Sequence, residues 1–348
     1  MIQRRSILKS GAALALGAPV LGSLAQQPVT LKFHTFMAPT SNVWTLMLKP
    51  WMEKVEKDSG GRIKFEAYPA MQLGGTPVQL YDQARDGVVD VVWTLPGYTA
   101  GRFVRSEAFE LPFMMNEAEA TSRAFWEYIQ QNAPDEFKDT KVLALHVHGP
   151  GVFHSTRQIK SPKDLNGMKV RAPTRQVAKL LGAYGAIPVG MPLPAVSDAL
   201  AKGTIDGLAT PWDVVPSVKV HELTKFSTEF PRDAPAMYTG TFVMAMNPAK
   251  YNALPPDLKK VIDDNSGMLT SGLFGKITQD SDSIGKKAAE SRGNTIYTLS
   301  DAEAKEFMKL SSKIDQEWVA DMNSRGHDGK RLLESAKSLI AKHGKKAS

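Results

Sequence analysis

Hydrophobic and polar residues along this chain form short blocks that alternate between two periodicities. Over Val29–Phe36 apolar residues alternate with polar ones, which predicts a strand. Over Asn42–Ser59 the apolar residues fall at helical spacing and the block ends before two glycines, which predicts a helix. The run Val88–Trp93 is apolar almost throughout, as in a strand that is buried on both faces. This part of the chain is therefore expected to alternate between strand and helix.

The same alternation continues through the middle of the chain. Further strands are predicted at 63–68, 142–148, 168–172, 205–210 and 239–246, and further helices at 76–87, 177–184 and 194–202. From Pro256 onward the pattern is mostly helical, and Ser300–Glu303 has the sequence of a capping box. This order of elements predicts the α/β class, and its length predicts two lobes with a ligand cleft between them.

The first 25 residues have a different pattern, in which charge is followed by a short apolar run. Arg4, Arg5 and Lys9 precede an uncharged segment, 11–24, and Ala25 completes a small-x-small sequence after it. This arrangement is typical of an export signal that is cleaved near Ala25, and the run is too short to cross a bilayer, which needs about 20 apolar residues. The adjacent arginines indicate the twin-arginine type, with an ordinary secretory signal as the alternative. Either route predicts a periplasmic protein.

The composition argues against a lipid-anchored protein and gives no support for a nucleic-acid-binding one. The 348 residues include no cysteine, so no disulfide staples the fold and no lipid-bearing cysteine follows the signal. The mature chain is therefore expected not to be anchored in the membrane. The formal net charge is +7, but basic residues are interspersed with acidic ones, so the charge pattern does not predict a nucleic-acid partner.

Signals for catalysis are weak. His146 and His148 point to the same face of a predicted strand and His154 follows soon after, so a metal site has to be considered. Zinc takes three or four ligands, and neither an HExxH motif, a cysteine nor an acidic cluster accompanies these histidines. The motifs G-x-S-x-G and G-x-G-x-x-G and the P-loop do not occur either. We therefore expect a protein that is not an enzyme and holds no metal or cofactor, with a metal hydrolase as the enzymatic alternative.

Six motifs occur in an informative order. They are Tyr68–Gly75, Asp86–Asp90 and Phe109–Phe113 in the first part of the chain, then Ile159–Pro173, Gly185–Val189 and Ala199–Gly207. Through this series, over residues 29–330, the chain resembles the substrate-binding subunits of tripartite ATP-independent periplasmic (TRAP) transporters, the DctP family.

The resemblance implies the fold of a periplasmic binding protein, with long helices spanning both lobes. The expected organisation is an export signal at 1–25, lobe I at 26–148, lobe II at 149–236, a return to lobe I at 237–275 and C-terminal helices across both lobes at 276–348. The resemblance also implies a small organic acid as ligand, the membrane subunits of a TRAP transporter as partners, and a monomer or homodimer. A receptor of a different importer class can share the two-lobed shape and is the alternative among binding proteins.

Arg171 is the principal candidate for binding the ligand. It is the arginine of a Lys-Val-Arg motif, and the resemblance implies a salt bridge between this arginine and the carboxylate of the ligand. A guanidinium suits that role because it is planar, always charged and offers paired N–H donors that match two carboxylate oxygens. The alternative is that Arg171, which precedes Ala172-Pro173, only solvates a loop.

Trp212 follows the predicted strand 205–210, at a turn where the resemblance places another ligand contact. Many family members have Gln-Glu-Asn-Pro in this region, whereas this chain has Leu208–Asp213. An indole in place of an amide predicts a ligand with a flat or apolar body, and argues against a sugar acid, which needs several polar partners. The alternative is a tryptophan of the core.

Four further residues are expected to line the cleft. Many members have Ser-Glu-Val-Tyr where this chain has Pro194–Ser197, so a carboxylate and a phenol are lost, and Leu193 is expected to offer an apolar surface instead. Tyr98 leaves a buried strand and Phe113 follows Leu111-Pro112, and each is a candidate for the cleft or for the core.

His148 ends a predicted strand just before Gly149-Pro150-Gly151. We expect it to face the cleft and to bind a hydroxyl group of the ligand. Together these residues predict a monocarboxylate with an aromatic or apolar body. A 2-oxo acid, a hydroxy acid and a dicarboxylate are the alternatives.

Overall fold

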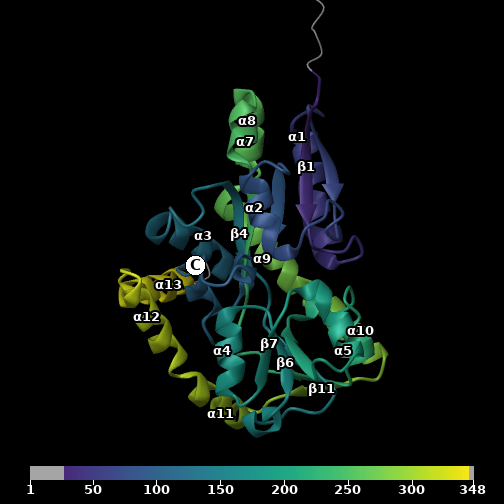
Figure 1. The fold of residues 1–348 in the computed structure, drawn as a ribbon, viewed down its shortest axis with the longest axis vertical. Coiled ribbons are helices and arrows are strands. Elements are labelled where there is room, and N and C mark those ends of the chain that lie inside the picture. Colours follow the sequence, from purple (N-terminus) through teal and green to yellow (C-terminus); the bar gives the residue numbers. More distant parts are fainter. Residues whose placement is uncertain (1–26, 345–348) are drawn as a thin grey trace, which may run out of the picture.

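Two β-sheets, each covered by helices, form two lobes of the molecule (Figure 1). The computed structural model describes residues 27–344, so the predicted export signal at 1–25 lies outside the described residues. The two-lobed α/β fold expected from the sequence is confirmed. Within 27–344, no helix combines the length and the apolar character that crossing a membrane requires.

The first sheet has five strands. Its order is β2 (Ile63–Tyr68), β1 (Val29–Thr35), β3 (Val91–Thr94), β10 (Thr241–Met246) and β4 (Lys141–Val147). Strands β1, β2 and β3 are parallel, whereas β10 is antiparallel to both of its neighbours. Strands β3 and β10 are buried at every position, which agrees with their continuous apolar sequences.

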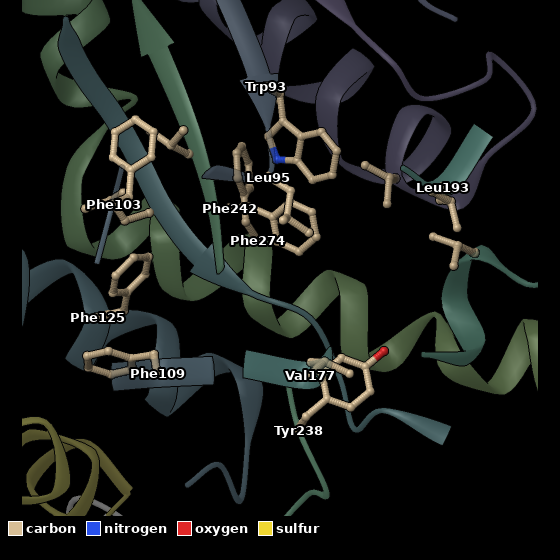
Figure 2. Packing of buried hydrophobic residues seen from close by; sticks show 14 of the residues in the cluster. Trp93, Leu95, Phe103, Phe109, Phe125, Val177, Leu193, Tyr238, Phe242 and Phe274 are labelled. Atoms are coloured by element: carbon tan, nitrogen blue, oxygen red, sulfur yellow. The ribbon is translucent and has the colours of Figure 1, made fainter. Parts of the chain in front are cut away.

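Helices surround this sheet in the first lobe, and most of them bury apolar side chains. The helix predicted at 42–59 is confirmed, as a π-helical segment at Val43–Leu48 that continues into α1 (Lys49–Asp58). The other helices of this lobe are α2 (Leu80–Arg85), α3 (Ala118–Asn132), α7 (Pro248–Ala253), α8 (Pro256–Asp264) and α9 (Gly267–Asp280). Figure 2 shows Phe109 and Phe125 in this core. Their ring centroids are 5.0 Å apart and their planes are tilted by 47°.

The second sheet has six strands. Its order is β11 (Thr295–Thr298), β9 (Phe226–Glu229), β5 (Val152–Ser155), β8 (Gly207–Thr210), β6 (Lys169–Ala172) and β7 (Ile187–Gly190). The helices around it are α4 (Arg175–Ala183), α5 (Val196–Ala201), α6 (Val220–Leu223) and α10 (Asp282–Ser291). The segment after residue 276, expected to be mostly helical, also contains strand β11, which pairs with β9 in parallel.

The chain passes between the lobes at several places. Residues 148–151 join β4 to β5, residues 230–240 join β9 to β10, and α9 leads to α10 through Ser281. Finally α11 (Asp301–Ser311), α12 (Ile314–Ser324) and α13 (Gly329–Gly344) run from the second lobe back to α3 of the first, along one side of the molecule (Figure 1).

Two glycines allow the crossing segments to pack closely. A Cβ atom on Gly151 would lie 2.0 Å from Cε1 of Tyr238, and one on Gly149 would lie 2.2 Å from Oδ2 of Asp282. Any other residue at either position would have to displace those side chains. The first crossing therefore leaves room for a tyrosine from the second crossing and an aspartate from the third.

Candidate ligand-binding cavity

A cavity lies between the two lobes where these crossings meet. The space among its lining side chains is about 440 Å³, counting the mouth that opens to solvent. The first lobe contributes mostly aromatic and aliphatic side chains, and the second contributes most of the polar ones.

Aromatic rings from the first sheet form one wall. Trp93 of β3 stacks on Phe242 of β10, with centroids 4.6 Å apart and planes 10° apart, and Phe36 lies 5.4 Å from Trp93. The indole Nε1–H of Trp93 donates to Nε2 of His146 at 2.9 Å, which fixes the ring. Figure 2 shows Trp93, Leu95 and Phe242 gathered between the first sheet and the side chains of Leu193 and Tyr238. A planar apolar group fits such a wall.

Arg171 brings a positive charge into this apolar cavity. It lies on β6 and is only 2% exposed. Its Nε donates to the carbonyl oxygen of Met191 at 3.0 Å, and its Nη1 donates to that of Ala209 at 3.2 Å. Within residues 27–344 these partners are backbone carbonyls, and no carboxylate forms a salt bridge with the guanidinium. Because a buried charge without a counter-ion is costly, the arrangement favours the binding of an anion.

Two tyrosines add neutral hydroxyl groups. The hydroxyl of Tyr98, from the first lobe, accepts a hydrogen bond from the N–H of Leu193, in the second lobe, at 3.0 Å. Its own proton is thus free for another acceptor. The buried hydroxyl of Tyr238 has no hydrogen-bond partner among the described residues. Burial raises the pKa of both phenols, and Arg171 partly opposes this, so both remain protonated donors near neutral pH.

The structure gives His148 a different part from the one expected. Its ring lines the cavity, but Nε2 accepts a hydrogen bond from the N–H of Gly240 at 2.9 Å, and Nδ1 faces the carbonyl of Gly149. Burial lowers the pKa of this imidazole to about 4, so the ring is neutral. His148 thus faces the cavity as expected, but both of its ring nitrogens are engaged by backbone groups, which leaves neither of them free for a ligand hydroxyl in this structure. The histidine instead ties the first crossing to the second.

The predicted indole wall at Trp212 is also wrong. Trp212 is buried, its Nε1–H donates to Glu229 at 2.7 Å, and its ring packs edge-on against His154 at 4.6 Å. Its chain neighbours Pro211 and Asp213 line the cavity, whereas Trp212 does not. Trp212–Val214 form a 3-10 turn, in which successive side chains point about 120° apart. The side chain of Asp213 can therefore face the cavity while that of Trp212 points elsewhere.

Phe113 is placed outside the cavity as well. Its ring packs on Phe230 at 5.5 Å, beside the C-terminal helix α13. Its backbone N–H is bonded to the second crossing, and the expectation that its side chain lines the cleft is wrong, because the ring lies against Phe230 instead. The structure thus brings Arg171, Tyr98, His148 and Leu193 together around one cavity. Sequence reasoning missed Trp93, Tyr238, Phe242 and the carboxyl group of Asp213.

Asp213 and Asp282 form a buried acidic pair at the edge of the cavity. Oδ1 of Asp282 accepts the backbone N–H of Asp213 at 2.9 Å and so holds the turn. The Asp213 carboxyl lines the cavity, and its Oδ1 has no hydrogen-bond partner among residues 27–344. Burial raises the pKa of Asp213 to about 7, and burial together with the charge of Asp213 raises that of Asp282.

This raised pKa predicts how stability depends on pH. The native state favours the protonated form of Asp213. The contribution of this side chain to stability is therefore fully present below its pKa in the unfolded chain, about 3.9, and is lost as pH rises through its native pKa of about 7. Asp213→Asn removes that titration. In the absence of ligand, we compare the unfolding free energy of the variant with that of the wild type at each pH. The difference, variant minus wild type, is expected to increase by on the order of 1–2 kcal/mol between about pH 5 and about pH 8. Urea unfolding at both pH values checks this, and a difference that is independent of pH would contradict it.

A second ionic cluster joins the lobes outside the cavity. Glu107 lies in the turn Ser106–Glu110 of the first lobe, and its buried carboxylate accepts hydrogen bonds from Arg175 and Gln176 of α4 in the second lobe. Arg175 also donates to Asp321 of α12 at 2.8 Å. These charge-assisted bonds hold the two lobes against each other.

A fold of two α/β lobes around a charged, aromatic-walled cavity defines a solute-binding protein. The family model for bacterial extracellular solute-binding protein, family 7 (DctP), matches residues 34–321. The chain therefore belongs to this family, and its similar structures are solute-binding proteins of TRAP transporters. The family predicted from the sequence is confirmed.

Three solved structures are informative relatives. A TRAP solute-binding protein of Rhodoferax ferrireducens T118, in complex with copurified benzoate, is 66% identical, with a TM-score of 0.91 over 92% of this chain and 100% of that chain. A marine metagenome protein specific for aromatic acid ligands, in complex with 3-hydroxybenzoate, is 48% identical, with a TM-score of 0.90 over 92% and 100%. A Bordetella bronchiseptica protein with bound mandelate is 27% identical, with a TM-score of 0.83 over 90% and 99%.

Proposed function

We propose that this protein binds an aromatic monocarboxylate of the benzoate type in the cavity between its lobes and delivers it, in the periplasm, to the membrane subunits of a TRAP transporter. The observation that carries the proposal is Arg171, a buried guanidinium that forms no salt bridge with a carboxylate of residues 27–344, in a cavity walled by Trp93 and Phe242. The similar structures with benzoate, 3-hydroxybenzoate and mandelate support the same ligand class.

The proposed pose follows from the chemistry of the lining groups. The carboxylate of the ligand binds Arg171, and the proton of Tyr98 is available as a second donor to it. The ring lies along the wall of Trp93 and Phe242, opposite Leu193. A sugar acid would leave several hydroxyl groups against apolar side chains, which costs free energy for each group left without a hydrogen bond.

Binding is proposed to close the lobes. The ligand contacts side chains from both lobes at once, so it binds the closed form better than an open one and shifts the population toward it. The bond between Tyr98 and Leu193 and the cluster of Glu107 with Arg175 add contacts between the lobes in the closed form. No covalent bond is made or broken in this mechanism.

The export signal completes the proposal. Residues 1–25 would direct the chain to the periplasm and be removed near Ala25. The mature protein would then meet its ligand outside the cytoplasm, on the side from which the membrane subunits import it.

A thermal-shift screen tests the ligand class. At a concentration of about 100 times Kd, benzoate is expected to stabilise the protein by about 2.7 kcal/mol, which raises Tm by several degrees. Glucuronate and sialate, at the same concentration, are expected to leave Tm unchanged. Stabilisation by the sugar acids alone would overturn the proposal.

A further inference from the structure

The proposed pose leaves one polar feature of the cavity without a partner. Asp213 is 2% exposed, lines the cavity and has no hydrogen-bond partner for its Oδ1 among the described residues. Buried polar atoms are almost always hydrogen-bonded, and a carboxyl oxygen left without a bond is costly. Arg171 accounts for the carboxylate of the ligand, but nothing in that pose uses Asp213.

The position of Asp213 is fixed by the fold. The turn that carries it is held by Asp282, which accepts the N–H of Asp213 at 2.9 Å, and by Asn42, whose amide donates to the carbonyl of Asp213 at 2.9 Å. These two residues come from the third crossing and from the first lobe. Gly149 leaves the space that the Asp282 carboxyl occupies. Three separate segments thus hold the Asp213 carboxyl at the cavity.

Tyr238 supplies the complementary group. Its hydroxyl is buried, lines the same cavity and also has no partner among residues 27–344. Asp213 lines this cavity too, and the charge of its carboxylate adds to burial in raising the pKa of the phenol. Above about pH 7 the Asp213 carboxyl is ionised and accepts a hydrogen bond, whereas the Tyr238 hydroxyl donates one. A hydroxyl group both donates and accepts, so it matches this pair, whereas an ether only accepts and a hydrogen atom does neither.

We infer that Asp213, together with Tyr238 in the same cavity, is a specificity-determining residue that selects aromatic carboxylates bearing a ring hydroxyl group. The inference rests on the proposed function, because it assumes that Arg171 binds the carboxylate of the same ligand. The ring hydroxyl donates to Oδ1 of Asp213 and accepts from the hydroxyl of Tyr238.

A ligand series on the unmodified protein tests the inference first. Affinities are measured by calorimetry for benzoate, the three monohydroxybenzoates and the three corresponding methoxybenzoates. At least one hydroxybenzoate is expected to bind about tenfold or more tightly than benzoate, and its methoxy analogue is expected to lose that gain. If no hydroxybenzoate binds more tightly than benzoate, the inference fails while the proposed function stands. If benzoate itself does not bind, both fail.

A variant then assigns the effect to the residue. In Asp213→Asn the ratio of hydroxybenzoate to benzoate affinity is expected to fall at least fivefold, because the amide is a weaker acceptor than the carboxylate. Asp198→Asn makes the same change on an exposed helix position outside the cavity and is expected to keep the ratio of the wild type. An unchanged ratio in Asp213→Asn, with a cooperative thermal transition showing that the variant is folded, would overturn the assignment.

Discussion

Replacing Arg171 with alanine is expected to weaken the binding of benzoate at least about 100-fold. The guanidinium is buried, is oriented by the carbonyls of Met191 and Ala209, and is not neutralised by any carboxylate of the described residues. Removing one partner of a buried, hydrogen-bonded charge pair costs about 2–5 kcal/mol or more, much of it from the charge left unpaired. Calorimetric titration of the variant measures the loss directly.

The matched control for this variant is Arg232→Ala. Arg232 is exposed on the second crossing, so its replacement removes the same charge without touching the cavity. Its affinity for benzoate is expected to stay within about threefold of the wild type, because long-range charge effects are screened by salt. Near-normal affinity in Arg171→Ala would show that the carboxylate binds elsewhere.

Replacing Glu107 with glutamine is expected to weaken binding about tenfold, although Glu107 is not in the cavity. Its carboxylate accepts hydrogen bonds from Arg175 and Gln176 across the boundary between the lobes. Loss of charge assistance in these bonds costs on the order of 1–2 kcal/mol, and 1.4 kcal/mol corresponds to tenfold in affinity. Under the proposed mechanism the loss destabilises only the closed form, which is the form that binds the ligand. The measured affinity for benzoate is therefore lowered.

Scattering in solution separates this effect from a general loss of stability. The Glu107→Gln variant is expected to show a larger radius of gyration than the wild type at the same subsaturating benzoate concentration, and the same radius when saturated. Glu119→Gln, which removes one partner of an ion pair within α3, serves as the control and is expected to bind normally. If Glu107→Gln bound benzoate as the wild type does, the cluster would not contribute to closure.

Much of the fold could be predicted because periodicity reports burial. Strands such as β1 and β3 have a regular or continuous apolar pattern, and both were predicted within a few residues. Strand β7 was missed because it contains Pro188 and is mostly exposed at the edge of its sheet, so no apolar pattern marks it. Strands β5, β9 and β11 were also missed, because each has only four residues and includes polar ones, whereas the equally short β3 is apolar almost throughout.

The candidate site was predictable only in part, for a geometric reason. Sequence motifs indicated Arg171 and the turn after β8, but not which side chain of that turn faces the cavity. In that turn a shift of one residue exchanges Trp212 for Asp213, and the sequence carries no signal that decides between them. Tyr238 was missed because residues 230–240 form an irregular crossing without a repeat. Its position depends on contacts with Gly151 that only the folded chain brings together.

The order of strands in the first sheet also determines when the molecule can fold. Strand β10 lies between β3 and β4, so this sheet has a gap in its middle until residue 246 has been made. The second sheet lacks its edge strand until residue 298. Neither lobe is a continuous stretch of sequence, so cutting the chain at one point cannot yield a complete half. Assembly therefore depends on contacts between distant segments, which makes folding slow and leaves unpaired strand edges exposed to aggregation during synthesis.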